Sequence, residues 1–350
     1  MNRRDFLRPQ QLLGSAVKAF GLGEKFLDQK PETDIPLTRY ARRAMATTFE
    51  VLLPVGTIRG AAAASAALDL IDQLEDQLTV YRDTSEMSRI NRQAAVSPQA
   101  VEEKLFDLLT MADRLTQETE GAFDIAVGAM IKAWGFYRRR GRVPAPEERS
   151  AVMEQSGMRH VHLDPARRTI SFCRQGLEIN LGSIGKGYAL DRVGQLLRGQ
   201  WGIKSALLHG GHSSVLAIGS QPATRRGWPV GILHPQRHGR RRAIVNLRNR
   251  ALGTSAATFQ HLRYEGRKLG HILDPRTGWP GEGVLSASVT APTAAFADAL
   301  ATAFYVMGVE KAQAYCAGHP GIGAVILTEG GKQPIILGHA QEEIDSSCLT

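Results

Sequence analysis

Apolar residues recur every three or four positions in several segments, and this spacing predicts core-facing helices. An alanine-rich stretch at 59–80 carries an apolar stripe, and leucines repeat at the same spacing between about 100 and 119. A third helix is predicted to begin at the glycine turn 182–187. A fourth carries ADALATAFYVMG and is predicted to end at Gly308, because glycine suits a left-handed helix cap.

Shorter apolar runs between turn residues predict strands, beginning with TTFEVLLP at 47–54. The other predicted strands are, in chain order, VHLD, TISF, LEIN, SALLHG, SVLAIG, PVGILH, AIVNL, LGHIL and VLSASVT. Strands outnumber helices and do not alternate regularly with them. We therefore expect an α+β fold of mixed, largely antiparallel sheets with packed helices.

The two ends of the chain differ in residue composition from its middle. Residues 1–39 are interpreted as an amino-terminal arm and linker, residues 40–340 as one folded domain, and residues 341–350 as a tail. Within the arm, the run 3–7 (RRDFL) resembles the core of a twin-arginine export signal, but the apolar stretch after it is short and weak. Export to the periplasm and an unprocessed arm on a cytoplasmic protein both remain open.

The composition is that of a globular protein, since 43% of the 350 residues are hydrophobic and 22% are charged. No apolar run approaches the roughly 20 residues that a membrane-spanning helix needs. The formal charge of +9 comes largely from arginine clusters and favours anionic partners. Nucleic acid is not the expected partner, because no recognised nucleic-acid-binding motif accompanies the arginines. The three cysteines are widely spaced and support neither a disulfide framework nor a thiolate metal site.

Two segments near the carboxyl end, HILDPRTG and ADALAT, contain candidate catalytic and metal-binding residues. In the first, Asp274 begins a tight turn that Gly278 closes, and the reversal can aim His271, a candidate base. In the second, Asp298 and Thr302 lie four residues apart on a predicted helix. Their oxygens therefore share one helix face, within reach of a single hard cation.

Two glycine-rich turns follow predicted strands. INLGSIGKGYALD joins a strand to the start of a helix, an arrangement that offers free backbone N–H groups to a phosphate. Its glycines match neither the nucleotide-binding P-loop nor the dinucleotide-binding fingerprint, so only a general anion site is predicted. HGGHSS pairs two histidines, but no third zinc ligand lies nearby.

In order along the chain, seven segments resemble motifs of the ApbE family, the FAD:protein FMN transferases. The resemblance runs from about Tyr40 to Gly308 and is nearly letter for letter in the last two motifs. The matching segments are MATTFEV, YRDTSEMSRIN, GAFDIAVGAMIKAWGF, INLGSIGKGYALD, ALGTSAATF, and HILDPRTGWP with ADALAT.

The resemblance implies an enzyme that transfers the FMN half of FAD to a threonine hydroxyl of an acceptor protein, with release of AMP. Mg²⁺ is the implied metal, and Ser183, Asp298 and Thr302 are the implied ligands. His271 would take the proton of the acceptor, and Lys186 would hold phosphate oxygens. The positions that match the family's FAD-binding residues are Met45, Tyr81, Phe123, Asp124, Asn180, Lys186 and Ile272.

This sequence departs from the family motifs at several positions. An aspartate expected after the second glycine turn is His212, the leading aspartate of the first glycine turn is Asn180, and a motif glycine is Ala256. Two further departures are Ala46 and Ser183. These substitutions leave two alternatives open: an FAD pyrophosphatase that forms FMN and AMP without an acceptor, and a non-catalytic FAD-binding protein.

Overall fold

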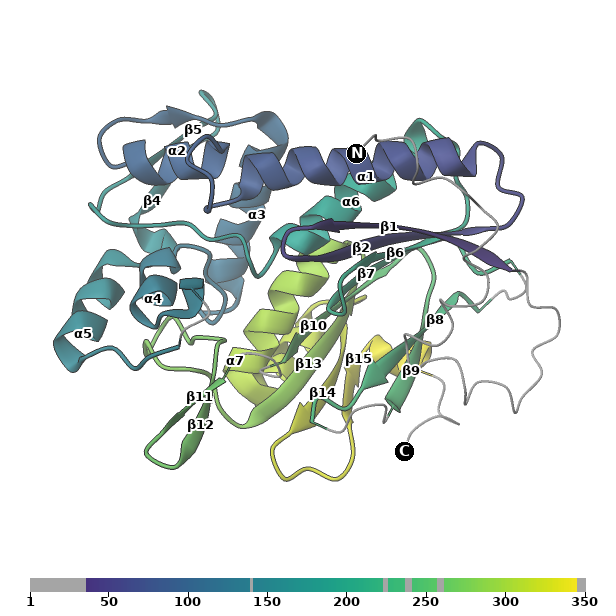
Figure 1. Cartoon of the computed structure of the whole chain (residues 1–350). Helices are drawn as coiled ribbons and strands as arrows, with labels where there is room; N and C mark the ends of the chain where they lie inside the picture. Colours follow the sequence, from purple (N-terminus) through teal and green to yellow (C-terminus); the bar gives the residue numbers. More distant parts are fainter. Residues whose placement is uncertain (1–35, 139–140, 223–225, 237–240, 257–260, 345–350) are drawn as a thin grey trace, which may run out of the picture.

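An eight-stranded antiparallel sheet forms the centre of the computed structural model, which describes residues 36–138, 141–222, 226–236, 241–256 and 261–344 (Figure 1). The run that resembles an export signal and parts of the arginine clusters lie outside the described residues. The sheet confirms the expected α+β class. Its strands are, in spatial order, β1 (Leu37–Ala44), β2 (Thr47–Pro54), β6 (Ala206–Gly210), β7 (Ser214–Ile218), β10 (Ala251–Ala256), β13 (Val284–Ala291), β14 (Gly323–Thr328) and β15 (Ile335–Gly338).

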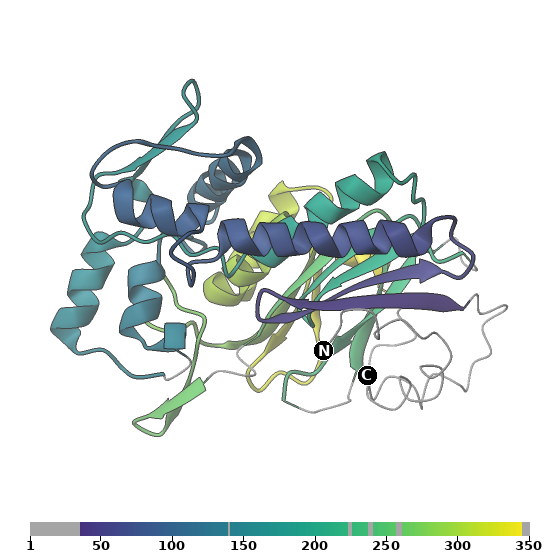
Figure 2. The ribbon, with the colours of Figure 1, turned by 45° about the horizontal axis from the view of Figure 1, so that its top comes forward.

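Three helices cover one face of this sheet (Figure 2). They are α1 (Gly60–Leu78), α6 (Gly185–Gly199) and α7 (Ala294–Gly318). The apolar stripe predicted for the first of them is buried, from Leu68 to Leu78. The apolar side chains between sheet and helices form the main hydrophobic core.

The hairpin of β8 (Trp228–Leu233) and β9 (Arg241–Leu247) packs on the opposite face of the sheet and forms a second, smaller core. Strand β7 lies between the two cores, and all five of its residues are buried. Strand β8 instead alternates buried and exposed residues, because only one of its faces is covered.

A separate group of short elements lies beside the end of α1 (Figure 1). Its helices are α2 (Glu86–Gln93), α3 (Glu103–Glu118), α4 (Gly128–Ala133), α5 (Pro146–Gln155) and the single 3₁₀ turns η1 (Phe136–Arg138) and η2 (Met158–His160). Its small sheet consists of β3 (Gln99–Ala100), β5 (Thr169–Phe172) and β4 (Val161–Asp164). The remaining elements of the chain are the hairpin β11 (His261–Tyr264) and β12 (Arg267–Gly270), and helix α8 (Ala340–Glu343).

Three expectations from the sequence are corrected. LEIN is not a strand, because its backbone bonds to the side chain of Asn91 and to the loop that holds Ile125. LGHIL is a regular strand only as far as Gly270, where β12 ends, and Leu273 forms an isolated bridge with Pro280. Gly308 has the left-handed backbone expected of it, with φ 81°, but it marks a kink from which helical structure continues to Gly318.

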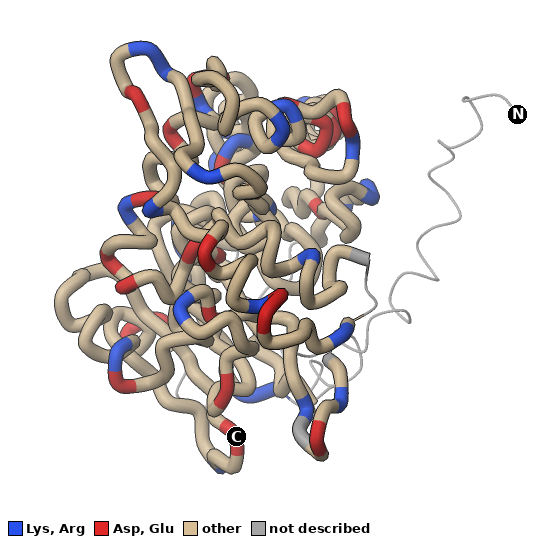
Figure 3. The backbone as a smooth tube through the Cα atoms, turned by 90° about the vertical axis from the view of Figure 1, so that its left-hand side faces the viewer, with Lys and Arg blue, Asp and Glu red and all other residues tan. Residues whose placement is uncertain are grey.

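Charges of both signs are interspersed along the backbone on the side of the molecule shown in Figure 3. Across the described residues, ion pairs such as Arg42 with Asp72 and Arg168 with Glu103 join charges of opposite sign. Within the described part of the chain, no helix combines the length and the apolar character needed to cross a bilayer.

Helices α6 and α7 approach each other so closely that only glycine fits between them at one point. A Cβ atom on Gly187 would lie 2.1 Å from the carbonyl oxygen of Ala294. Strand β10 meets α7 in the same way, since a Cβ atom on Gly253 would lie 2.4 Å from the carbonyl carbon of Ala297. These two contacts fix α7 against its neighbours.

We expect Gly187→Ala to destabilise the protein by about 3 kcal/mol, because the backbone of α7 must move to admit one methyl group. Gly199→Ala, at the other end of the same helix, is the matched control, since no atom lies within 4 Å of its added Cβ. This control should be neutral or stabilise by up to about 1 kcal/mol. Urea unfolding of both variants measures the difference, and equal stabilities would contradict the close contact.

Candidate active site

A cavity of about 260 Å³ opens where the end of α1, the β1–β2 turn and the glycine turn before α6 meet. Four residues that the sequence assigned to FAD binding line this cavity. Tyr81 follows α1, Met45 lies in the β1–β2 turn, and Asn180 and Lys186 flank the glycine turn. The complete lining is Met45, Ala46, Glu75, Leu78, Thr79, Val80, Tyr81, Asn180, Leu181, Gly182, Gly185 and Lys186.

The β1–β2 turn has an unusual backbone for its residues. Met45 and Ala46 have φ angles of 48° and 59°, in the left-handed region that non-glycine residues seldom adopt. Two consecutive residues of this kind match the tight turn that joins twisted antiparallel strands. The pairing of Ala44 with Thr47 across the turn keeps it in place and presents Met45 to the cavity.

Side-chain and backbone hydrogen bonds shape the glycine turn before α6. The Oδ1 atom of Asn180 accepts a hydrogen bond from the backbone N–H of Gly182 at 2.9 Å. The ammonium of Lys186 lies 3.4 Å from the carbonyl oxygen of Gly182 and lines the cavity. Ser183 lies within the turn and is half-buried. The turn therefore brings one positive charge to the cavity at the start of a helix, where anions are favoured.

Asp298 is the buried carboxylate of the candidate site. Its Oδ2 atom accepts a hydrogen bond from the N–H of Gly187 at 2.8 Å, and the hydroxyl of Ser214 lies 2.8 Å from both of its oxygens. Burial raises the pKa of Asp298 to about 6, although the positive charge of Lys186 opposes the shift. Lys186 precedes Gly187 directly, so the carboxylate lies beside the part of α6 that borders the cavity.

Thr302 lies one turn further along α7, as the sequence predicted. Its hydroxyl is 3.0 Å from the hydroxyl of Ser255 and 3.3 Å from the backbone carbonyl oxygen of Asp298. The hydroxyls of Thr254 and Ser288, 2.9 Å apart, lie on the other face of the sheet, because successive residues of a strand point to opposite faces. Strand β10 thus contributes one hydroxyl, that of Ser255, to the turn of α7 that carries Asp298 and Thr302.

The donor set around Asp298 fits a hard divalent cation. An ionised carboxylate offers about four lone-pair sites, whereas Gly187 and Ser214 supply only two donor protons. Acceptor capacity therefore remains for a cation, and hydroxyl oxygens stand nearby. In the described ranges of the chain, no three His, Cys, Asp or Glu residues cluster as metal ligands. A cation here would thus depend on one carboxylate, hydroxyl groups and the ligand's own oxygens.

Asp191 sets the position of α7 and was not identified from the sequence as a functional residue. Its two carboxylate oxygens accept hydrogen bonds from the N–H groups of Ala294 and Ala295, each at 2.8 Å. This carboxylate on α6 therefore caps the first turn of α7. Ala294, which begins that turn, lies four residues before Asp298. Burial raises the pKa of Asp191 to about 6. The signal in the sequence was its place as the last residue of the motif segment INLGSIGKGYALD.

The turn predicted at HILDPRTG is present. The N–H of Gly278 donates to the carbonyl oxygen of Asp274 at 2.9 Å, and Gly278 has φ 70°. The carboxylate of Asp274 forms an ion pair with Arg276 at 2.8 Å, so it stabilises the turn itself. His271 lies just after β12, half-buried, with its ring edge-on to Phe136 at a centroid distance of 6.4 Å. It is not part of the cavity lining.

Three other residues assigned to FAD binding lie outside the cavity lining. Phe123 is fully buried in the main core, and Ile272 is half-buried against it. Asp124 accepts hydrogen bonds from the N–H groups of Ala126 and Met158, at 2.7 and 2.9 Å. Burial raises the pKa of Asp124, and its hydrogen bonds tie the helical segments on either side together.

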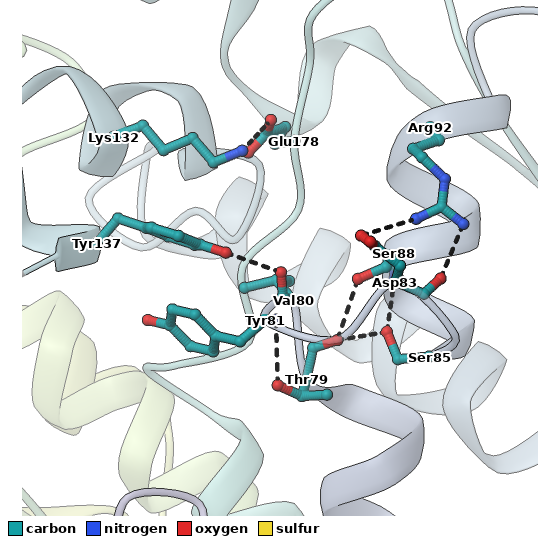
Figure 4. Close-up of polar contacts among 10 residues, drawn as sticks. All are labelled: Thr79, Val80, Tyr81, Asp83, Ser85, Ser88, Arg92, Lys132, Tyr137 and Glu178. Atoms are coloured by element: carbon teal, nitrogen blue, oxygen red, sulfur yellow. Dashed lines mark hydrogen bonds and ion pairs between the residues drawn. The ribbon is translucent and has the colours of Figure 1, made fainter.

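The segment that carries Tyr81 has no regular secondary structure, and polar contacts hold it (Figure 4). The N–H of Tyr81 donates to the hydroxyl of Thr79 at 3.2 Å, and the hydroxyl of Ser85 donates to the carbonyl oxygen of Thr79. The guanidinium of Arg92 donates to the carbonyl oxygen of Asp83 at 2.9 Å. The sequence motif identified Tyr81 but gave no indication of these supporting contacts.

The fold and the site define an α+β protein with a ligand cavity at the glycine turn of α6 and a buried carboxylate beside it. The model of the ApbE family matches residues 45–326, so the chain belongs to this family. This result confirms the family resemblance stated from the motifs.

Relatives with known names are similar over most of the chain. "FAD:protein FMN transferase" of Treponema pallidum is 34% identical, and the match covers 77% of this chain and 79% of the relative. The protein of the same name from Salmonella typhimurium is 32% identical, over 67% of this chain and 68% of the relative. Among solved structures, the ApbE protein of Thermotoga maritima has a TM-score of 0.78 and 27% identity, covering 88% of this chain and 98% of its own.

We expect Asp191→Asn to change how stability depends on pH. The folded pKa of Asp191 is raised from 3.8 to about 6, so folded protein retains a proton that unfolded protein releases in this range. The free energy of unfolding of the metal-free wild type should therefore fall as pH rises from about 4 to 6, and stay low above that. Asparagine resembles the protonated form and should remove about 3 kcal/mol of this fall.

Urea unfolding of the metal-free protein at pH 4.5, 5.5, 6.5 and 7.5 tests the expectation. Asp107→Asn is the control, because Asp107 is an exposed aspartate of α3 whose carboxylate pairs with Lys104 at the surface. Parallel pH curves for wild type and Asp191→Asn would show that Asp191 titrates normally.

Proposed function

We propose that this protein is an FAD:protein FMN transferase: it transfers FMN from FAD to a threonine hydroxyl of an acceptor protein and releases AMP, with Mg²⁺ as the metal. Residues 40–340 form the transferase domain in this proposal. The observation that supports it most directly is the cavity, in which four expected FAD-binding residues meet beside the buried Asp298. The family membership and the names of the relatives support the same activity.

The substrate is a dinucleotide with a charged pyrophosphate, and the first glycine turn suits that charge. Lys186 and the N–H groups at the start of α6 would hold phosphate oxygens. Asp298, Thr302 and Ser183 would hold Mg²⁺. When bound, Mg²⁺ neutralises negative charge on the pyrophosphate oxygens and thereby stabilises the departing AMP. Tyr81 and Met45 offer apolar surface to the ring systems at the other parts of the cavity.

The proposed reaction is a single transfer at phosphorus. The hydroxyl oxygen of the acceptor threonine forms a bond to the phosphorus of the FMN half, and the phosphoanhydride bond to AMP breaks. His271 takes the proton of the threonine hydroxyl, a task that suits an imidazole near neutral pH. The electron pair of the broken bond leaves with the phosphate of AMP. No oxidation or reduction takes place.

Two alternatives differ from this proposal in their products. An FAD pyrophosphatase would form free FMN and AMP with water in place of the threonine. A non-catalytic FAD-binding protein would bind FAD and leave it intact. The substitutions at His212 and Ala256 motivate the second alternative, since both replace motif residues of the family.

Incubation of the purified protein with FAD should separate the three functions. We expect AMP, together with a fluorescent acceptor that keeps its flavin after denaturation, when Mg²⁺ and an acceptor with an S/T-G-A-T type site are both present. Omission of Mg²⁺ or replacement of the acceptor threonine by valine should abolish the labelled product. AMP and free FMN without an acceptor would favour the pyrophosphatase, and intact FAD in every mixture would sink the proposal.

We expect His271→Ala to slow the transfer about 10²- to 10⁴-fold, the usual contribution of a general base. Binding of FAD, followed by flavin fluorescence without Mg²⁺, should change little, because His271 does not line the cavity. His319→Ala is the matched control, since the imidazole of His319 stacks on Tyr315 near the end of α7. A His271→Ala variant as active as wild type would rule out His271 as the base.

A further inference from the structure

Tyr81 is a large aromatic side chain that the fold leaves 65% exposed at the cavity. It belongs to the irregular segment between α1 and α2, where no helix or strand fixes the backbone. A loop side chain can provide a defined surface for a ligand only if its neighbours limit its motion. The contacts that restrain this tyrosine are therefore part of the site.

Tyr137 supplies two of those contacts from a distant part of the sequence, the 3₁₀ turn η1. Its hydroxyl donates to the backbone carbonyl oxygen of Val80 at 3.0 Å, directly before Tyr81. Its ring lies against the ring of Tyr81, with a centroid distance of 4.5 Å and an angle of 31° between the planes (Figure 4). One side chain thus holds both the backbone and the ring of the Tyr81 segment.

Tyr137 is itself held in place. The ammonium of Lys132, on α4, lies 5.2 Å from the centre of the Tyr137 ring, a cation–π distance. The same ammonium forms an ion pair with Glu178 at 2.5 Å. Lys132, Tyr137 and Tyr81 therefore form a continuous series of contacts from α4 to the cavity. Of the three, only Tyr81 lines the cavity.

We propose that Tyr137 is a positioning residue for substrate binding: it sets the plane of the Tyr81 ring so that a planar aromatic ring of the dinucleotide stacks on it. This inference rests on the proposed function, because it takes FAD as the ligand. Tyr137 does not line the cavity and acts through Tyr81. Aromatic pairs have preferred offset or tilted geometries, so removal of one ring changes the orientation of the other.

The test compares Tyr137→Phe, which removes only the hydroxyl, with Tyr137→Leu, which also removes the ring. Tyr40→Phe is the control, since Tyr40 is a half-buried tyrosine of β1 outside the cavity lining. Flavin fluorescence is titrated with protein in the absence of Mg²⁺, and it gives both the affinity and the quenching of fully bound flavin. FAD, FMN and AMP are titrated separately, with AMP measured by competition, to find which ring stacks.

We expect the Kd for FAD to rise about threefold in Tyr137→Phe and about tenfold in Tyr137→Leu. The KM for FAD should rise in parallel, while kcat stays within twofold of wild type, because stacking contributes equally to ground-state and transition-state binding. The quenching at saturation should weaken in Tyr137→Leu, which a purely structural effect on stability would not cause. Loss of affinity for FMN alone, or for AMP alone, identifies the stacked ring.

Wild-type affinity and wild-type quenching in both variants would overturn the positioning role. If Tyr137→Leu does not fold, Tyr137→Phe still decides the question, because its Kd for FAD can be compared with that of the wild type. The proposed function fails separately, if wild-type protein binds FAD but forms no AMP with Mg²⁺ and acceptor. A wild type that binds no FAD would overturn both.

Discussion

The burial of one carboxylate, Asp298, between two closely packed helices is the constraint on which the site depends. A charged group removed from water requires compensating partners, and these come from Gly187 on α6 and Ser214 on β7. The N–H of Gly187 can reach the carboxylate only because α6 has no side chain at that position. The same close packing directs Lys186 toward the cavity. A shared backbone contact thus places the positive charge and the carboxylate together.

The central sheet brings the remaining polar groups of the site to this helix pair. Strands β7 and β10 lie next to each other, and each contributes a hydroxyl beneath α7: Ser214 and Ser255. Asp191 completes the arrangement, because it fixes the first turn of α7 from α6. The rigid elements therefore hold the candidate metal ligands, whereas turns and a loop hold the residues that line the cavity. Recognition of the rings thus depends on local contacts such as that between Tyr137 and Tyr81.

Much of the fold was predictable because its strongest signals are periodic. The stripe on α1, the leucines of α3 and the strand TTFEVLLP each follow one period throughout. LEIN was wrong because an apolar run of four residues does not reveal where its backbone hydrogen bonds go; here they go to Asn91 and Ile125. In the site, spacing alone placed Asp298 and Thr302 on one helix face. Ser214 and Tyr137 could not be found in this way, since they act through contacts between segments far apart in sequence.

Two of the departures from the family motifs, Asn180 and Ala46, have different physical consequences. Asn180, in place of an aspartate, still accepts the hydrogen bond from Gly182 that shapes the turn, so the turn keeps its form. It carries no negative charge, and its neutrality favours a polyanionic ligand next to Lys186. Ala46 keeps a left-handed backbone that glycine would adopt without strain, and the tight hairpin between β1 and β2 holds it there. Both substitutions therefore preserve the shape of the cavity while they change its charge or strain, and neither removes a group that the proposed chemistry requires.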